Sequence, residues 1–223
     1  MVASEKQLGI FYLEKGQASF FSPTLLAGLS IKIPVNVVND MEIIDKETLL
    51  LLVKNLLTSS RVVCGQILII LSADFTFEGG FAQESLEERA EKLKTFQELV
   101  PFENVETRVI RQEKKWRVIV INKDFVDGFK EIFSKLSISV LGVGLFVLLK
   151  ESFPELAQGF RAKTIFDKIE TVKSSCLIES EPKPVPELQS ETPKKNSNLK
   201  ILLIIFGVLL LILLILILSN ISR

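Results

Sequence analysis

The sequence of 223 residues contains no histidine, one tryptophan, one tyrosine and two cysteines. Histidine is the commonest general base in enzymes and a frequent zinc ligand, so its absence excludes His-dependent triads and His-based metal sites. Small exported domains more often carry a set of several spaced cysteines, so Cys64 and Cys176 favour an intracellular domain. A disulfide between them is the less favoured alternative, and Cys64 is interpreted as a small apolar residue.

The net charge is zero, because lysine plus arginine and aspartate plus glutamate both number 27. The sequence also lacks a long run of charges of one sign. Neither nucleic-acid binding nor a polybasic lipid-binding surface is indicated. The carboxylates cluster in predicted helices, where a solvated helix face explains them. The composition therefore predicts a protein that is not an enzyme, with no catalytic residue, no cofactor and no metal.

One long apolar run, Ile201–Leu218, contains eighteen residues without a charge. At about 1.5 Å per residue, a helix of this length just crosses a hydrocarbon core of about 30 Å. The alternatives are a buried core helix, which is rarely apolar on every face, and a GPI-type signal, which requires an export signal that the sequence does not show. The run predicts a C-terminal transmembrane helix, followed by a short outer tail, residues 219–223.

The charges beside this run predict its orientation. Lys194, Lys195 and Lys200 precede it, whereas Arg223 alone follows it. Cationic residues favour the cytoplasmic side. We therefore expect a single-pass protein of the inner membrane, with the lipid bilayer as one partner and residues 1–200 in the cytoplasm.

Residues 179–200 carry four prolines and almost no apolar side chains. Such a segment cannot bury enough surface to offset the entropy of ordering, so it is interpreted as a disordered tether between residues 1–175, a soluble domain, and the membrane. A recruiting proline-rich motif is the open alternative.

The soluble domain opens with a pattern of strands and one helix over residues 7–60. Alternating apolar residues predict strands at Leu8–Leu13, Ala18–Phe21 and Leu29–Pro34, with a hairpin turn at Lys15 and Gly16. Asp45 is the expected N-cap of a helix that ends near Ser59.

Residues 65–146 follow the order strand, helix, strand, strand, helix, strand. The predicted elements are Gln66–Leu71, Ser85–Leu99, Val105–Arg111, Trp116–Ile121, Asn122–Leu136 and Ser137–Phe146. This order predicts a βαββαβ ferredoxin-like unit, whose antiparallel sheet is covered on one face by two helices. A last helix is expected over residues 154–172, starting at Pro154. The predicted fold class is α+β.

Three short motifs resemble one known family. The run Leu8–Leu13 stands where that family has a Gly-Ile-Asp-Ile-Gly phosphate loop, Leu99–Glu103 is similar to its "vPfe" element, and Val118–Val126 is similar to its strand-into-helix junction. The family is that of the type IV pilus assembly protein PilM and its type II secretion counterpart GspL, within the actin-like ATPase superfamily. The resemblance implies actin-like first-lobe strands and helix, a strand-helix-strand-strand insert, and a linker into one membrane helix.

The sequence departs from that family at the loop. Phe11 stands in place of the aspartate, so a carboxylate that could coordinate a nucleotide-bound cation is missing. The soluble part is also too short for a second lobe, so the chain is expected to be a truncated and divergent relative. The resemblance then implies an architecture and a partner class, but no active site.

The leading hypothesis is a non-catalytic, membrane-anchored scaffold that recruits pilus or secretion assembly proteins at the cytoplasmic face. The alternatives are a nucleotide-responsive ATPase domain completed by a partner and a tail-anchored ferredoxin-like binding domain unrelated to pili; self-association stays open. The candidate contact residues are Trp116 as an aromatic anchor, with Lys114, Lys115 and Arg117 as a cationic rim. A strand-end role for Trp116 is the alternative.

Overall fold

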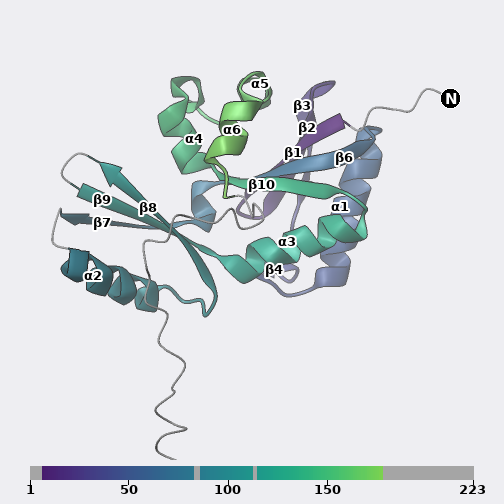
Figure 1. Cartoon of the computed structure of the whole chain (residues 1–223). Helices are drawn as coiled ribbons and strands as arrows, with labels where there is room; N and C mark the ends of the chain where they lie inside the picture. The colour runs from purple at the N-terminus through teal and green to yellow at the C-terminus, as the bar shows by residue number, and fades with distance from the viewer. Residues whose placement is uncertain (1–6, 83–85, 113–114, 178–223) are drawn as a thin grey trace, which may run out of the picture. The chain divides into compact units, whose positions relative to one another are not determined.

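The computed structural model describes residues 7–82, 86–112 and 115–177, which form a mixed α+β fold (Figure 1). The chain divides into residues 1–179 and residues 180–223. The predicted tether, transmembrane helix and outer tail lie outside the described residues and stay predictions. Within the described ranges, no helix is both long and apolar enough to cross a bilayer.

A five-stranded sheet forms the centre of the first unit, in the order β10-β6-β1-β2-β3. Its strands are β1 (Gln7–Glu14), β2 (Gln17–Ser22), β3 (Leu25–Lys32), β6 (Cys64–Leu71) and β10 (Ser139–Leu145). β1 and β2 are antiparallel, as are β2 and β3, whereas β6 runs parallel to both β1 and β10. The three opening strands that the sequence predicts are thus confirmed.

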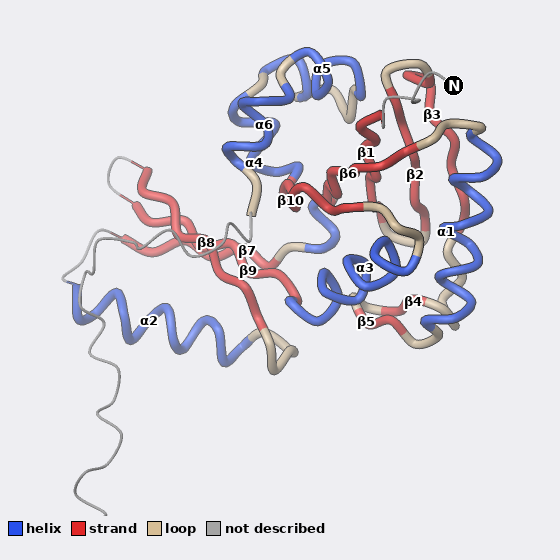
Figure 2. Tube along the Cα trace, turned by 45° about the vertical axis from the view of Figure 1, so that its right-hand side comes forward, coloured by secondary structure: helices blue, strands red, loops and turns tan. Residues whose placement is uncertain are grey.

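Helices cover both faces of this sheet (Figure 2). On one face lie α1 (Lys46–Ser60) and α3 (Lys123–Lys135), and on the other α4 (Phe146–Ser152), η2 (Pro154–Leu156), α5 (Ala162–Asp167) and α6 (Ile169–Ser175). Alternation along β6 sends Ile67, Ile69 and Leu71 into the first layer and Leu68 and Ile70 into the second. Strand β6 is apolar throughout this stretch because both of its faces are buried.

The helix α1 begins as the sequence predicts. Asp45 accepts hydrogen bonds from the backbone N–H of Thr48 at 2.9 Å and from its hydroxyl at 2.6 Å. The helix ends at Arg61, whose φ of 56° is left-handed. Beside it, the short strands β4 (Val38–Asn39) and β5 (Glu42–Ile43) form a hairpin.

A second sheet contains three antiparallel strands in the order β7-β9-β8. Its strands are β7 (Phe77–Ala82), β8 (Val105–Gln112) and β9 (Lys115–Asn122), and a short turn, η1 (Ala73–Phe75), leads into it from β6. Helix α2 (Leu86–Leu99) covers one face, where Leu93 and Phe96 pack around Val118 and Val120. The chain order β7-α2-β8-β9 is the strand-helix-strand-strand insert that the family resemblance implies.

The predicted βαββαβ ferredoxin-like unit is wrong. Its helices and four strands exist, but β6 and β10 belong to the five-stranded sheet and β8 and β9 to the other sheet. The physical reason is burial: β6 needs cover on both faces, which a ferredoxin-like sheet with one open face does not provide. Strand β7 was also missing from the predicted order.

The predicted last helix, residues 154–172, is also wrong as a single element. Helix α4 begins earlier, at Phe146, and the chain then forms η2, α5 and α6. Gly159 interrupts the helical path with a φ of 136°, a conformation that only glycine adopts readily. The predicted apolar positions Leu156, Phe160 and Phe166 nevertheless join one core with β1 and β6.

Candidate partner-binding cleft

The position of the family's loop aspartate is part of the hydrophobic core. The Phe11 side chain is fully buried. Its ring lies 5.0 Å from that of Phe133 and 5.9 Å from that of Phe129, centroid to centroid. A side chain at this position points into the layer formed by α3. The residue that differs from the family's loop aspartate therefore packs against this helix.

The following turn, Lys15 and Gly16, is the predicted hairpin turn, and Gly16 has a φ of 72°. The Lys15 N–H donates to a carboxylate oxygen of Asp74 at 3.3 Å. The Ser72 hydroxyl donates to the same oxygen at 2.9 Å. These bonds hold the turn against η1, at the rim of a cavity.

That cavity is an apolar pocket of about 330 Å³. Its floor comes from the β4-β5 hairpin and from the start of the second sheet, and its charged rim from the hairpin turn and η1. Its apolar lining includes Val35, Val38, Met41, Phe75, Phe77 and Phe102. Val35 is 75% exposed, although it is a large apolar residue. Its pocket therefore offers apolar surface to a partner side chain.

A second, wider cavity of about 730 Å³ shares Met41, Pro101 and Phe102 with the apolar pocket. These three residues make the two cavities neighbours, and the pair is called the cleft, with an apolar end and an acidic end. The acidic end is lined by five carboxylates, Glu42, Glu103, Asp124, Asp127 and Glu131, and by one lysine, Lys46. Lys46 is paired with Glu131 at 2.9 Å and Lys130 with Asp127 at 3.1 Å, so Glu42, Glu103 and Asp124 carry most of the negative charge of this end.

Asn122 positions the hairpin that lines both ends. Its side-chain amide donates to the Met41 carbonyl at 2.9 Å, while its side-chain oxygen accepts from the Phe125 N–H at 3.3 Å. Asp40 and Met41 both have positive φ, 43° and 65°, a conformation that is unfavourable for residues other than glycine. The hydrogen bond from Asn122 stabilises this turn. One buried side chain thus caps α3 and fixes the cleft wall.

The predicted contact residues lie elsewhere, on β9. Trp116 is partly buried, and the Arg111 guanidinium lies 5.8 Å from its ring centroid. Lys115 is exposed, and Lys114 lies outside the described residues. Because successive side chains of a strand point to opposite faces, Trp116 and Arg117 do not belong to one surface.

Arg117 makes ion pairs within the chain. It binds Glu78 at 2.6 Å and also pairs with Glu151 of α4, and its side chain is only 18% exposed. Burial disfavours its charged form, but hydrogen bonds to Glu78 and Glu151 outweigh this and raise the Arg117 pKa. A partner would therefore meet Lys115 on one face of β9 and part of Trp116 on the other, and the role of these residues in binding stays a prediction.

The sequence held one usable signal for the cleft. The element Leu99–Glu103, which carries part of the family resemblance, contributes Pro101, Phe102 and Glu103 to its lining. The apolar loop residues Val35 and Val38 gave no periodic pattern, so they were missed. In the described part of the chain, no cluster of carboxylates and thiols could hold a metal ion.

No protein-family model matches the sequence, and comparison with curated proteins finds no match either. Among solved structures, the chain is similar to a PilM-PilN type IV pilus biogenesis complex, with 14% identity and a TM-score of 0.47 over 68% of this chain and 52% of that chain. It is also similar to the cytoplasmic domain of EpsL, an inner membrane component of the type II secretion system of Vibrio cholerae, with 10% identity and a TM-score of 0.41 over 64% and 58%.

A third similar structure is a Bacteroides thetaiotaomicron protein of unknown function with an actin-like ATPase fold, with 13% identity and a TM-score of 0.34 over 66% and 56%. The chain thus spans a little over half the length of these matched proteins.

Proposed function

We propose that this protein is a non-catalytic, membrane-tethered module that binds a segment of a pilus-type or secretion-type assembly protein at the cytoplasmic face of the inner membrane. One observation carries the proposal: the Leu99–Glu103 element, which links the sequence to PilM and GspL, lines both ends of the cleft through Pro101 and Phe102. The partner class comes from that sequence resemblance and the binding mode from the cleft.

The cleft favours a particular kind of segment. Its apolar end accepts a side chain beside Val35, Val38 and Met41, where burial of apolar surface contributes about 25 cal/mol per Å². Its acidic end favours a lysine or arginine on the same segment, because complementary charges fix orientation. We expect a peptide with an apolar anchor and a neighbouring basic residue.

The proposed absence of catalysis rests on Phe11. A nucleotide-bound cation needs oxygen ligands, and this position carries a ring that is packed against Phe129 and Phe133. The predicted tether and membrane helix would then strengthen partner binding, because tethering raises the effective concentration of the domain near membrane partners.

The test uses the full chain with an affinity tag, extracted in mild detergent from cells that make a type IV pilus or a type II secretion system. Val35→Asp places a charge at the apolar end of the cleft. Val63→Asp is the matched control, since Val63 is 63% exposed, lies just before β6 and is not part of the cleft lining. Both substitutions are at exposed sites and should change stability by no more than about 0.5 kcal/mol.

We expect the wild type and Val63→Asp to recover a pilus or secretion component, identified by mass spectrometry. Val35→Asp should reduce its recovery about tenfold, because the charge must be desolvated on binding. Equal recovery with Val35→Asp would rule out the cleft as the binding site, and recovery of no such component by the wild type would rule out the partner class. Trp116→Ala, assayed alongside, tests the surface predicted from the sequence.

A further inference from the structure

The outer strands of the two larger sheets differ in how open their edges are. These strands are β10 and β3 in the five-stranded sheet and β7 and β8 in the three-stranded sheet. An outer strand presents backbone N–H and C=O groups to which a further strand can be added. Bulges, glycines and covering segments hinder such pairing, so a long edge without them indicates an interaction surface.

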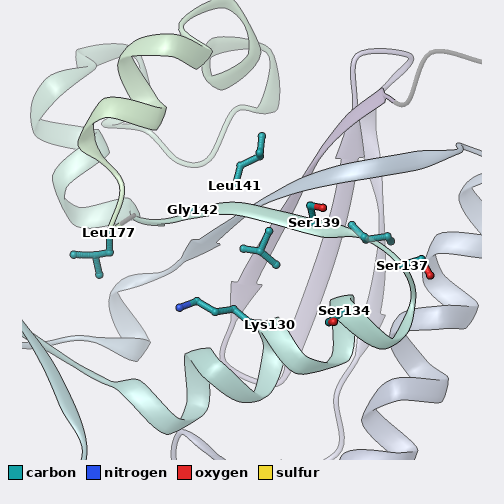
Figure 3. Close-up of a pocket in the computed structure, with 9 residues that line it drawn as sticks. Lys130, Ser134, Ser137, Ser139, Leu141, Gly142 and Leu177 are labelled. Atoms are coloured by element: carbon teal, nitrogen blue, oxygen red, sulfur yellow. The ribbon is translucent and has the colours of Figure 1, made fainter. Parts of the chain in front are cut away.

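Three of these edges carry such features. Leu177, which lines a groove of about 460 Å³ (Figure 3), pairs with Val143 at the outer edge of β10. The ladder between β2 and β3 is bulged, and Gly28 of β3 has a φ of 71°. Strand β7 contains two adjacent glycines, Gly79 and Gly80, which weaken a strand. These edges therefore do not offer a long, regular row of backbone groups.

Strand β8 lacks these features. It is eight residues long, contains neither proline nor glycine, and pairs with β9 in an unbroken register. Within the described part of the chain, no backbone hydrogen bond reaches its outer edge. The residues from Val105 to Ile110 are all half-buried, so this part of the strand stays partly accessible. β8 is therefore the edge best suited to pair with another strand.

The ladder with β9 indicates which residues of β8 direct their backbone groups outward. Lys123 N–H donates to the Asn104 carbonyl at 2.9 Å, which places Asn104 among the positions that bond to β9 and its continuation. In an antiparallel ladder, such positions occur at every second residue. The backbone groups that point away from β9 are those of Val105, Thr107, Val109 and Arg111.

The residues between these positions carry opposite charges on one face. Glu106 and Arg108 are two residues apart, so their side chains project from the same side of the sheet. On this side, the Arg108 guanidinium donates to the Ser175 carbonyl of α6 and keeps further N–H donors. In the described ranges, the Glu106 carboxylate has no ion-pair partner.

This charge pattern is self-complementary. When two copies of a strand pair in antiparallel orientation about a two-fold axis, the residues that face each other lie on the same side of the sheet. With Thr107 at the axis, Glu106 faces Arg108 of the second copy, and this pair occurs twice. With Glu106 or Arg108 at the axis, two like charges would face each other. Charge therefore favours a second copy of this chain as the occupant, with Thr107 at the axis.

The start of β8 is compatible with this orientation. The Asn104 side-chain amide donates to the Asp124 carboxylate of α3 at 3.0 and 3.2 Å, so this end of the strand lies beside α3. In an antiparallel pair, the start of one strand lies beside the end of the other. The α3 helices of the two copies would thus lie at opposite ends of the paired segment, residues 105–109, which has the usual length of a strand.

We propose that β8 is a self-association surface, at which a second copy of this chain pairs in antiparallel orientation with Thr107 at the two-fold axis. Val105 of each copy exchanges backbone hydrogen bonds with Val109 of the other, and two ion pairs between Glu106 and Arg108 flank the axis. The two three-stranded sheets become one continuous sheet. No residue of β8 lines the cleft, so self-association and partner binding are separate properties.

The test measures sedimentation velocity of the full chain in density-matched detergent, with micelles in excess, over a range of protein concentrations. Glu106→Arg and Arg108→Glu each place like charges opposite each other at two positions of the dimer. A mixture of these two variants restores two opposite-charge pairs, because each chain supplies the charge that the other lacks. The double variant, Glu106→Arg with Arg108→Glu, restores them in identical chains. Circular dichroism confirms that each variant is folded.

We expect the wild type to dimerise as its concentration rises. Each single variant should dimerise about tenfold more weakly, since like charges replace two ion pairs, whereas the mixture and the double variant should dimerise as the wild type does within about threefold. The proposal is overturned if the wild type stays monomeric, or if the single variants dimerise as well as the wild type. It is also overturned if the mixture of folded variants dimerises no better than either alone.

Glu106→Gln provides a second measurement that does not depend on the Arg108 contact with α6. If Arg108→Glu does not fold, Glu106→Arg and Glu106→Gln are compared with the wild type. The glutamine removes one attraction at each ion pair, and the arginine adds a repulsion, so Glu106→Arg should weaken dimerisation more. Equal dimerisation by the two variants would overturn the pairing of Glu106 with Arg108.

Discussion

The ring of Phe11 meets that of Phe133 nearly at a right angle, 81°, with centroids 5.0 Å apart. This contact joins β1 to α3 at the position where the PilM and GspL family has a loop aspartate. Aromatic pairs in this edge-on geometry contribute about 0.5–1.5 kcal/mol beyond their area burial. A packed aromatic ring therefore stands at the position that the sequence resemblance pairs with that aspartate.

Phe11→Asp should therefore destabilise the domain and should not create a nucleotide-binding site. Loss of a buried ring costs about 3–5 kcal/mol, and burial of a carboxylate adds to it. Phe11→Leu, the control, should cost about 1.5 kcal/mol, since it keeps an apolar side chain. Urea unfolding followed by Trp116 fluorescence measures both. A Phe11→Asp protein as stable as the wild type, with saturable ATP binding in magnesium, would contradict this account.

Arg117 should couple the second sheet to α4. Its two ion pairs join Glu78 of β7 to Glu151 of α4 across one guanidinium group. We expect Arg117→Met to cost about 1 kcal/mol, a modest value because both carboxylates are more than a third exposed and are screened by salt. A double-mutant cycle with Glu78→Gln gives the coupling energy. A coupling energy of zero at low salt would show that the pair does not hold the sheet in place.

The sequence predicted the elements that carry a strong local signal. Asp45 predicted the start of α1, and the apolar run Gln66–Leu71 predicted β6. Both are local signals, since a helix cap and an unbroken apolar stretch can be recognised from a few neighbouring residues. Strand β7 was missed because Gly79 and Gly80 lower strand propensity. Gly79 is required by packing: a Cβ there would lie 2.8 Å from the Phe96 ring.

Strand partners could not be predicted in the same way. β1 pairs with β6, Gly9 opposite Ile67, and the intervening residues give no local sign of that register. The cleft could not be predicted either, since its lining residues Val35, Phe77 and Phe102 come from three separate segments of the chain. The candidate surface around Trp116 was instead chosen from neighbouring residues in the sequence, and strand alternation sends those neighbours to opposite faces.

Glu131 should contribute stability that is lost in acid. Hydrogen bonds from Lys135 and Lys46 lower its pKa from 4.5 to about 2 in the folded state. A carboxyl group whose pKa is lowered by folding stabilises the fold above its unfolded pKa, and this contribution disappears as the pH falls toward the folded pKa. The window therefore runs from about pH 4.5 down to about pH 2.

The measurement compares melting temperatures of the wild type and Glu131→Gln across that window. The wild type should melt higher at pH 6, and the difference should shrink below pH 4.5 and vanish near pH 2. Salt should reduce the difference, because the group is exposed. Glu98→Gln is the control, since the Glu98 carboxylate lies 3.9 Å from the Lys94 ammonium group. A difference that does not depend on pH would assign the effect of Glu131→Gln to packing.

Cys176 should be nearly unreactive in the folded chain. It is buried, and burial raises its thiol pKa from 9.0 to about 12, although Arg108 acts in the opposite direction. Since the thiolate is the reactive form, three pH units correspond to about a thousandfold slower alkylation at pH 8. Mass spectrometry after iodoacetamide treatment should show Cys176 unmodified in native protein and modified in urea.

Cys64 provides the internal comparison. It is partly exposed, with a pKa that burial also raises, so it should react slowly but before Cys176. The two thiols cannot form a disulfide: Cys64 begins β6, whereas Cys176 lies beside Gly144, which pairs with Ile70, so about 20 Å of strand separates them. Non-reducing digestion should yield no linked peptide. Labelling of Cys176 as fast as Cys64 would mean that α6 does not stay packed on the sheet in solution.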